Sequence, residues 1–513
     1  MPKYYKNKNF RNYLFLFLSA VPLLIHLCIN IFAGYGYFRD ELYYIACSNR
    51  PAAGYVDQPP LSIFILILSR NLFGDSLFAL RSIPAVLSGL TVFITCLMVK
   101  ETGGKTFATI LASLAVILSP VYLAMNSYYS MNSLDIFLWS LAFYLVMLII
   151  NKNKTVHWII LGIVLGLGLL NKTGFLWFCA GLFAGLLLTD KRKELLTFKP
   201  YLTALIALAI FSPYLIWNFQ NDFAHIEFIR NAVMIKYSGI SYTDFITGQL
   251  INQGPVSVFI WLTGLYYFLF YETGLKFRIV AVIYVSVFLI LLVNGHSKAE
   301  YLSPAYTVLF AGGSVLIERK TIVRSNWVRY ALVIPLCLSG LLIAPFAAPV
   351  LPVETFIIYS NTLGIRPSSS ENKEMSELPQ FFADMHGWEE MASDVSKVYM
   401  SLPREERLRT VIYGHNYGEA SAMEFFRNKY PIPRAISSHN SFWLWGYGNT
   451  DDPVMIIIGG RKEDHLEVFE EVSEKLIHKA DYSMPYENNI PVYVAKKIKI
   501  PVNELWQRIK NYN

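Results

Sequence analysis

The chain has 513 residues, of which 54% are hydrophobic, 15% aromatic and 16% charged, and its mean hydropathy is +0.39. A soluble domain carries about 25% charged residues, so this composition excludes an ordinary soluble protein and indicates a membrane protein. The formal net charge of +7 comes without a nucleic-acid-binding motif, and five cysteines scattered along the chain provide no disulfide framework.

The apolar runs predict about eleven transmembrane helices. A helix needs about 20 apolar residues to cross the bilayer core, because every backbone polar group must be satisfied within the segment. The first run follows basic residues, as a signal peptide would, but its length and the lack of a cleavage site predict an uncleaved helix. The predicted spans are 13–33, 77–99, 107–125, 134–150, 156–171, 174–188, 200–217, 255–271, 279–294, 302–317 and 330–350.

The distribution of Lys and Arg between these spans predicts their orientation. With the N-terminus in the cytoplasm, the inner connections contain 18 Lys and Arg in 57 residues, whereas the outer ones contain seven in about 100. An odd number of spans then places everything after Val350 outside the cytoplasmic (inner) membrane. The two long outer loops, 34–77 and 218–253, are where we expect any chemistry.

Two domains are predicted. Residues 1–350 form the membrane body, and residues 351–513 form an extracytoplasmic domain. Short strands alternate with helices in the second domain, which indicates a small α/β fold. The predicted strands are 409–414, 453–460 and 491–498, and the predicted helices are 419–427 and 465–478.

The first outer loop gathers three carboxylates in RDELYYIACSNRPAAGYVDQPPL, residues 39–61. Asp40 and Glu41 open a predicted short helix, where they are either a cap and a first-turn residue or a catalytic base. Successive helical residues diverge by about 100°, so we expect only one of the two to face a substrate. Asp57 lies in a turn fixed by two prolines and, taken alone, is a turn carboxylate.

Other charged residues lie at the predicted outer ends of spans. An acidic residue within a span costs about 2.5–3.5 kcal/mol, so Asp135 at the start of the fourth span favours a functional role. Lys172, in the short turn GLGLLNKTG, is either a boundary anchor or a ligand for a lipid-linked phosphate. Arg81, Lys298 and Tyr301 have the same two interpretations.

The second long outer loop contains His225 and Glu227 in WNFQNDFAHIEF, residues 217–228. Neither residue has metal-ligand spacing with an identifiable partner, so the favoured interpretation of His225 is a satisfied surface histidine. The chain contains no nucleophile elbow, zinc motif or Walker loop.

Several motifs occur together in a characteristic order. They are the outward acidic pair, GYVDQPPL, the span-edge aspartate, GLGLLNK, WNFQNDF and SKAEYLSPAY, followed in the external domain by NYGEASAMEFF and SSHNSFWLWGYG. In this order the chain resembles the bacterial membrane glycosyltransferases of the protein-mannosyltransferase-like group, glycosyltransferase families 39 and 83. These have the GT-C fold and include aminoarabinose and galacturonic acid transferases of lipid A and lipopolysaccharide core. The resemblance covers most of the chain and leaves the sugar open.

The resemblance implies an inverting hexosyl- or pentosyltransferase that uses a polyprenyl-phosphate-linked donor. The acceptor would be an envelope component, namely lipopolysaccharide or lipid A, another glycan, or a protein. By position, Asp40 or Glu41 would be the catalytic carboxylate and Asp135 the second acidic residue. Lys172 and Arg81 would neutralise the departing lipid phosphate.

Five further residues are expected to contribute to the same site. Lys298 would bind the donor phosphate, and Asp57, Gln58, Tyr301 and His225 would line the substrate pocket. Gln58 stands where many relatives carry His or Lys, so no phosphate contact is assigned to it. The sequence shows no set of metal ligands. Metal use varies across the family, so the resemblance leaves the use of a divalent ion undecided.

A secondary transporter or flippase of lipid-linked or envelope precursors is the alternative function. Transporters tend to show repeated halves and charges deep inside their helices. This sequence shows no repeat, and its charges crowd one face of the membrane.

Overall fold

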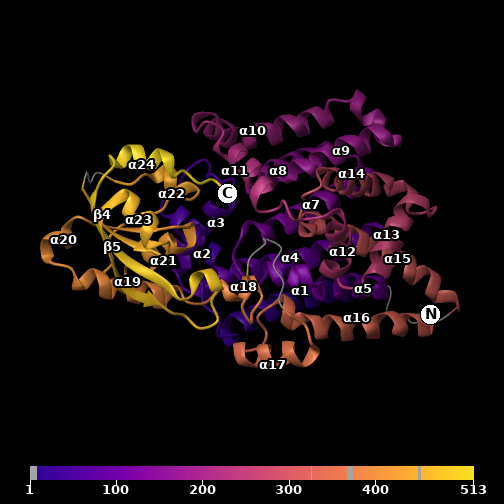
Figure 1. Cartoon of the computed structure of the whole chain (residues 1–513). Helices are drawn as coiled ribbons and strands as arrows, with labels where there is room; N and C mark the ends of the chain where they lie inside the picture. The colour runs from indigo at the N-terminus through magenta and orange to yellow at the C-terminus, as the bar shows by residue number, and fades with distance from the viewer. Residues whose placement is uncertain (1–7, 325, 367–373, 449–451) are drawn as a thin grey trace. The chain divides into compact units, whose positions relative to one another are not determined.

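A computed structural model describes residues 8–324, 326–366, 374–448 and 452–513, and it is helical apart from one small sheet (Figure 1). Lys3 and Lys6, which enter the orientation argument, lie outside the described residues. The chain divides into two compact units, each made of three segments. Unit 1 comprises Met1–Ala33, Phe73–Ile216 and Ile240–Leu351, and unit 2 comprises Gly34–Leu72, Trp217–Gly239 and Pro352–Asn513.

The units therefore differ from a simple division of the chain at residue 350. Most of the first long outer loop, and part of the second, group with the C-terminal segment. The assignment of residues 1–350 and 351–513 as functional domains stays a prediction.

Unit 1 is built from apolar helices. Its elements are α1 (Lys8–Phe32), α4 (Leu77–Glu101), α5 (Thr106–Ile117), α6 (Pro120–Met125), α7 (Met131–Lys152), α8 (Thr155–Asn171), α9 (Phe175–Leu188), η2 (Asp190–Leu196), α10 (Lys199–Gln220, whose last turn is in unit 2), α12 (Tyr242–Gln253), α13 (Val258–Phe270), η3 (Leu275–Phe277), α14 (Arg278–Asn294), η4 (Ala299–Ala305), α15 (Tyr306–Arg324) and α16 (Asn326–Ala347).

Six helices of the described chain are long and apolar enough to cross a membrane, and a bent pair, α12 with α13, makes a seventh if counted as one span. The protein is therefore a multi-pass membrane protein, while the predicted count of eleven is not confirmed. The six are Asn9–Phe32, Leu77–Glu101, Met131–Lys152, Lys199–Gln220, Leu275–Asn294 and Trp327–Ala347.

Some predicted spans are interrupted or short. The predicted span 107–125 is two helices, because α5 ends at Ile117 and Pro120 begins α6 at a position where its missing N–H costs nothing. Helices α8 and α9 have 17 and 14 residues. The apolar runs thus mark helices correctly, but not always one full span each.

Glycines allow helices of unit 1 to pack closely. A Cβ atom on Gly264 of α13 would lie 2.0 Å from the Leu309 carbonyl oxygen of α15, and one on Gly313 would lie 1.9 Å from the Ile260 carbonyl oxygen. Small residues that let two backbones approach are typical of helix association in membranes.

Unit 2 combines short helices with the sheet. Its elements are α2 (Arg39–Ser48), α3 (Leu61–Phe73), α11 (Ala224–Ile235), α17 (Val353–Leu363), α18 (Gln380–Ala383), α19 (Trp388–Ser401), α20 (Arg404–Leu408), β1 (Thr410–Gly414), α21 (Tyr417–Phe426), β2 (Ala435–Ile436), α22 (Ser441–Trp445), β3 (Val454–Ile458), α23 (Lys462–Val468), β4 (Phe469–His478), η5 (Pro485–Glu487), β5 (Ile490–Ile498) and α24 (Val502–Arg508).

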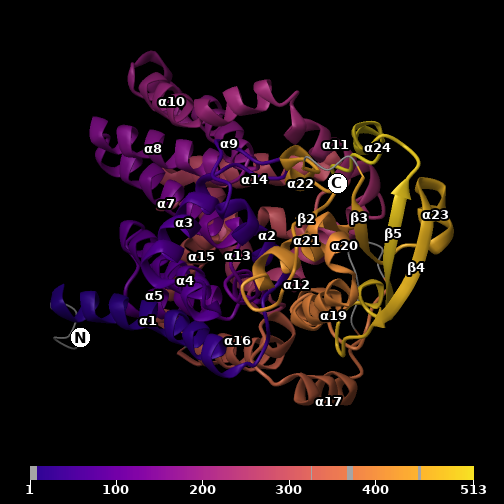
Figure 2. The same cartoon turned by 90° about the vertical axis from the view of Figure 1, so that its left-hand side faces the viewer.

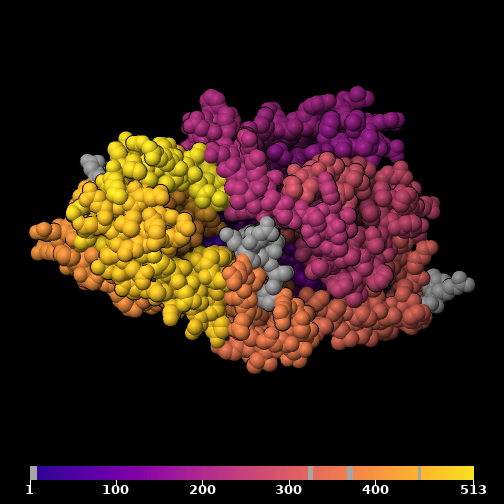
Figure 3. Space-filling view, in the orientation of Figure 1, coloured from indigo at the N-terminus to yellow at the C-terminus, as the bar shows by residue number. Residues whose placement is uncertain are grey.

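The sheet has five strands in the order β2-β1-β3-β5-β4. Strand β1 pairs in parallel with β2 and β3, whereas β5 pairs antiparallel with both β3 and β4. Figure 2 shows β4 and β5 as a long antiparallel pair at one side of the sheet. In Figure 3 the atoms of the C-terminal segment are orange to yellow. The predicted small α/β fold at the C-terminus is confirmed.

The predicted helix 465–478 is wrong. Helix α23 ends at Val468, and residues 469–478 form strand β4. The pairing of β4 with β5 shifts register between Glu474 and Leu476, so its buried residues do not alternate strictly. The apolar residues Phe469, Val472 and Leu476 are spaced as in a helix, but the hydrogen bonds to β5 make this segment a strand.

Three distant segments meet in the core of unit 2. Val56 of the first loop, Ala224 of α11 and Tyr512 near the C-terminus form one buried apolar cluster. A second cluster covers the sheet and includes Phe469 and Trp506. The first cluster explains why the two loops belong to the same compact unit as the C-terminal segment.

Candidate functional site

The predicted site residues fall into two groups, one in each unit. Unit 2 contains Asp40, Glu41, Asp57, Gln58 and His225, and unit 1 contains Arg81, Asp135, Lys172, Lys298 and Tyr301.

Asp40 and Glu41 have different surroundings at the start of helix α2. Glu41 is completely buried, and its Oε2 accepts a hydrogen bond of 2.9 Å from the Phe38 backbone N–H at the start of the helix. Asp40 is one residue earlier, and its side chain is 35% exposed. Glu41 therefore caps the start of α2, while the Asp40 side chain stays partly exposed.

The carboxylate of Asp40 is held through one of its oxygens. The Tyr417 hydroxyl donates to Asp40 Oδ1 at 2.8 Å, and Arg39 Nε lies 3.8 Å from the same atom. Arg39 also reaches Asp384, with Nη2 at 3.5 Å from Oδ2, and donates from Nη1 to the Tyr486 hydroxyl at 3.1 Å. Tyr417 was not singled out from the sequence, although it lies in the quoted segment NYGEASAMEFF.

The turn that carries Asp57 is fixed by hydrogen bonds within unit 2. Tyr43 donates to Asp57 Oδ1 at 2.8 Å, and the Val56 backbone N–H donates to the Ser441 hydroxyl at 3.1 Å. Burial, reinforced by the negative charge of Asp40 and opposed by the hydrogen bond from Tyr43, raises the pKa of Asp57 to about 6. Asp57 therefore takes up a proton more readily than an ordinary aspartate.

His225 and Gln58 lie beside this turn. His225 is 7% exposed, so the expectation of a surface histidine is wrong; its Nδ1 lies 2.9 Å from the Val56 carbonyl oxygen. Burial lowers its pKa to about 4, and the neutral ring donates to that carbonyl. Gln58 is completely buried, and neither end of its side-chain amide has a hydrogen-bond partner among the described residues. Their roles in a substrate pocket stay predictions.

In unit 1, Lys172 forms the centre of the second group. It follows the last residue of α8 with an extended backbone, and its Nζ donates to Asn132 Oδ1 at 2.8 Å. The same Nζ lies 3.9 Å from Asp135 Oδ2 and 5.2 Å from the centre of the Tyr301 ring. The sequence analysis predicted Lys172, Asp135 and Tyr301 as site residues. It missed Asn132, which lies one turn before Asp135 on α7.

The other two predicted phosphate-binding cations of unit 1, Arg81 and Lys298, have different surroundings from Lys172. Arg81 is 2% exposed near the start of α4. Lys298 precedes η4, and its Nζ lies 4.0 Å from Glu300 Oε1. Their predicted contacts with a donor phosphate stay predictions.

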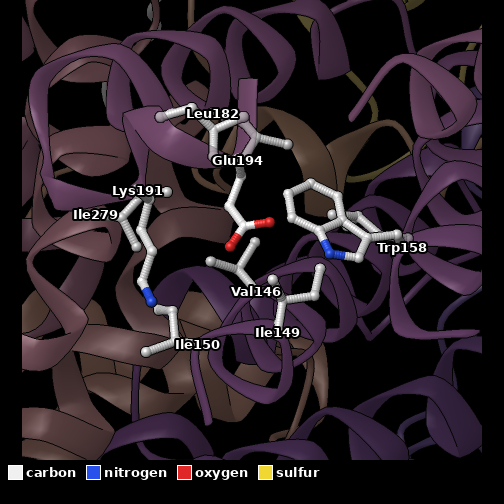
Figure 4. A pocket seen from close by; sticks show the side chains of 10 residues that line it. Val146, Ile149, Ile150, Trp158, Leu182, Lys191, Glu194 and Ile279 are labelled. Atoms are coloured by element: carbon white, nitrogen blue, oxygen red, sulfur yellow. The ribbon is translucent and has the colours of Figure 1, made fainter. Parts of the chain in front are cut away.

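A pocket elsewhere in unit 1 contains none of the predicted residues. It lies between α7, α8, α9, η2 and α14, and Figure 4 shows the Glu194 carboxylate pointing into it near Val146 and Trp158. Asn153 Nδ2 donates to Glu194 Oε1 at 2.8 Å. We interpret this pocket as a gap between packed helices. Among the described residues, no group of three or more His, Cys, Asp and Glu side chains could hold a metal ion.

Comparison with known proteins defines the class of the fold. A family model described as dolichyl-phosphate-mannose-protein mannosyltransferase matches residues 57–217. The structure of ArnT from Cupriavidus metallidurans bound to undecaprenyl phosphate matches with a TM-score of 0.60, covering 95% of this chain and 98% of that one at 11% identity. The chain therefore has the fold of that protein, the GT-C fold, which confirms the fold expected from the sequence.

Two further relatives are more limited in coverage. An undecaprenyl phosphate-alpha-4-amino-4-deoxy-L-arabinose arabinosyl transferase of Pseudomonas savastanoi pv. phaseolicola is 26% identical over 177 residues. That alignment covers 33% of this chain and 32% of the relative, so about a third of its length is matched. The oligosaccharyltransferase of Archaeoglobus fulgidus matches with a TM-score of 0.51 at 13% identity, over 84% of this chain and 64% of that one.

Proposed function

We propose that this protein is a membrane glycosyltransferase that moves a sugar from a polyprenyl-phosphate donor to a hydroxyl of an envelope acceptor. The observation that carries the proposal is the arrangement of Asp40, whose Oδ1 is held by Tyr417 and Arg39 while the side chain stays 35% exposed. A held and accessible carboxylate is what a general base requires. The GT-C fold and the family match to residues 57–217 support the same class of reaction.

The proposed step is an in-line displacement at the anomeric carbon. The acceptor oxygen forms a bond to that carbon, and the bond from the carbon to the phosphate oxygen breaks. Asp40 takes the proton of the acceptor hydroxyl, and the polyprenyl phosphate leaves with the bonding electrons. One displacement inverts the configuration at the anomeric carbon.

Lys172 is the proposed cation for the leaving phosphate. Asn132 and the ring of Tyr301 hold its Nζ in place, so little reorganisation is needed when negative charge develops on the phosphate. Asp135, 3.9 Å from the same Nζ, would orient the lysine rather than act as the base. Arg81 and Lys298 are proposed as additional phosphate contacts.

The proposed location is the outer face of the cytoplasmic membrane, with a cytoplasmic N-terminus and an external C-terminal domain. The excess of Lys and Arg in the inner connections supports this orientation. The proposed acceptor is a lipid, glycan or protein of the envelope, and the donor carries its sugar on a polyprenyl phosphate.

Sugar transfer in proteoliposomes tests the proposal. The purified protein is supplied with a panel of labelled polyprenyl-phosphate sugars and an envelope lipid extract, and labelled product is measured. Asp40→Asn should lower the rate by about 10²–10⁴-fold, the range of general base catalysis. Asp452→Asn is the matched control, because this carboxylate is 55% exposed and pairs only with Arg409 in the described contacts.

Two outcomes would contradict the proposal. Full activity of Asp40→Asn would show that the base is elsewhere. Movement of a labelled solute or lipid across sealed vesicles, without consumption of any donor, would replace the enzyme by the transporter alternative.

A further inference from the structure

Tyr417, far from Asp40 in sequence, contacts the proposed base directly. The two residues are 377 positions apart, and both belong to unit 2. The hydroxyl of Tyr417, the first residue of α21, donates to Asp40 Oδ1 at 2.8 Å. The C-terminal segment therefore supplies the hydrogen-bond donor to a carboxylate on the first loop.

The ring of Tyr417 is held by aromatic contacts. Its centre lies 4.7 Å from the ring of Tyr43 and 4.9 Å from the ring of His439, and the Arg39 guanidinium lies 5.4 Å above it. A Cβ on the next residue, Gly418, would lie 2.5 Å from Arg39 Cγ, so α21 approaches α2 closely here. The hydroxyl is thus aimed before any substrate binds, and its hydrogen bond costs little side-chain entropy.

A second tyrosine repeats the arrangement. Tyr43, which packs against Tyr417, donates to Asp57 Oδ1 at 2.8 Å and accepts from the Ser441 backbone N–H at 3.3 Å. Each of the two carboxylates is therefore bonded to one member of a packed tyrosine pair. A change at one tyrosine hydroxyl need not disturb the other, because Tyr43 keeps its own partners.

We propose that Tyr417 is a positioning residue for Asp40, so that the C-terminal segment completes the base of the transferase. This inference rests on the proposed function. Tyr417 and Arg39 both engage Oδ1, which leaves Oδ2 to receive the acceptor proton. A donated hydrogen bond also favours the ionised carboxylate, which is the form that acts as a base.

The turnover number of a phenylalanine variant reports this role. The charged and polar groups near Asp40 include Arg39 on its own helix, Asp57 on the following loop and Tyr417 on α21. Tyr417→Phe removes only the hydroxyl donor and keeps the ring, so Asp40 loses the contact that orients its carboxylate while donor binding is kept.

The experiment compares Tyr417→Phe with the wild type in the transfer assay. The expected result is a turnover number lower by about tenfold or more, the size of effect of a hydrogen bond to a charged group. The KM for the donor should stay the same, and the double variant with Asp40→Asn should be no slower than Asp40→Asn alone. Tyr413→Phe is the matched control, since Tyr413 bonds to the Ser438 hydroxyl at 2.9 Å in the same unit.

Three outcomes separate the inference from the proposed function. A wild-type turnover number in Tyr417→Phe would overturn the inference alone. So would a loss in Tyr417→Phe that is matched by Tyr413→Phe and multiplies with that of Asp40→Asn, because this pattern indicates general destabilisation. An inactive wild-type protein would overturn the proposed function itself.

Discussion

Glu41 should be a structural residue, although it neighbours the proposed base. Its Oε2 accepts the Phe38 backbone N–H at 2.9 Å, and the side chain is completely buried. Glu41→Ala removes that acceptor. A buried donor left without a partner costs about 1–3 kcal/mol, and loss of a helix cap costs about 0.5–2 kcal/mol, two estimates of the same lost contact. We therefore expect Glu41→Ala to be about 1–3 kcal/mol less stable than the wild type.

Glu41→Gln is the informative comparison. Its amide oxygen can still accept from Phe38, so this variant should be more stable than Glu41→Ala. Both variants should keep turnover numbers within about threefold of the wild type where folded, since neither touches a reacting atom in the proposed mechanism. Thermal unfolding in detergent and initial transfer rates at saturating donor measure the two quantities separately.

One result would refute this reasoning. If Glu41→Gln melted at the wild-type temperature but transferred sugar at a hundredth of the wild-type rate, Glu41 would be the base. Asp40→Asn would then be expected to retain activity, and the assignment of the pair would be reversed.

Three other predictions follow from particular contacts. Lys172→Met should weaken binding of a polyprenyl phosphate by about tenfold or more, measured by a filter-binding assay, because a charge-assisted contact is lost; unchanged binding would contradict the phosphate role. The pKa of Asp57 is about 6 in the folded protein against an ordinary 3.8, so its contribution to stability is complete below pH 4 and lost as pH rises through 6. Asp57→Asn should accordingly raise the melting temperature at pH 8 and leave it unchanged at pH 4, and equal shifts at both would refute the pKa argument. Gly264→Ala should sharply reduce the yield of folded protein, since its Cβ would lie 2.0 Å from the Leu309 carbonyl oxygen; a normal yield in size-exclusion chromatography would show that α13 and α15 can separate.

The apolar runs of the sequence were sufficient to predict the helices of unit 1, because hydropathy is a local property. They were insufficient for the number of spans. Pro120 divides one run into two helices, and the bend of 105° between α12 and α13 depends on packing that no local pattern reveals. Strand β4 was predicted as a helix for a related reason, since its partner β5 and its register shift are tertiary features.

The candidate site was predicted in part. The sequence identified the acidic pair and the lysine of the short turn, because charges beside apolar spans are conspicuous. It could not decide between Asp40 and Glu41, since that decision depends on which side chain caps α2. Tyr417 could not be connected with Asp40 because the contact exists only in the folded chain, across 377 positions.

The three-segment construction of unit 2 limits how this protein can be recombined with its relatives. A chimera that exchanged only Pro352–Asn513 would place a foreign tyrosine and a foreign C-terminus against the original α2 and α11. Gly34–Leu72 and Trp217–Gly239 would have to be transplanted with it to keep the buried cluster and the donor to Asp40 intact. Substitutions in the two loops and in the C-terminal segment are therefore expected to covary among related proteins, although they lie hundreds of residues apart.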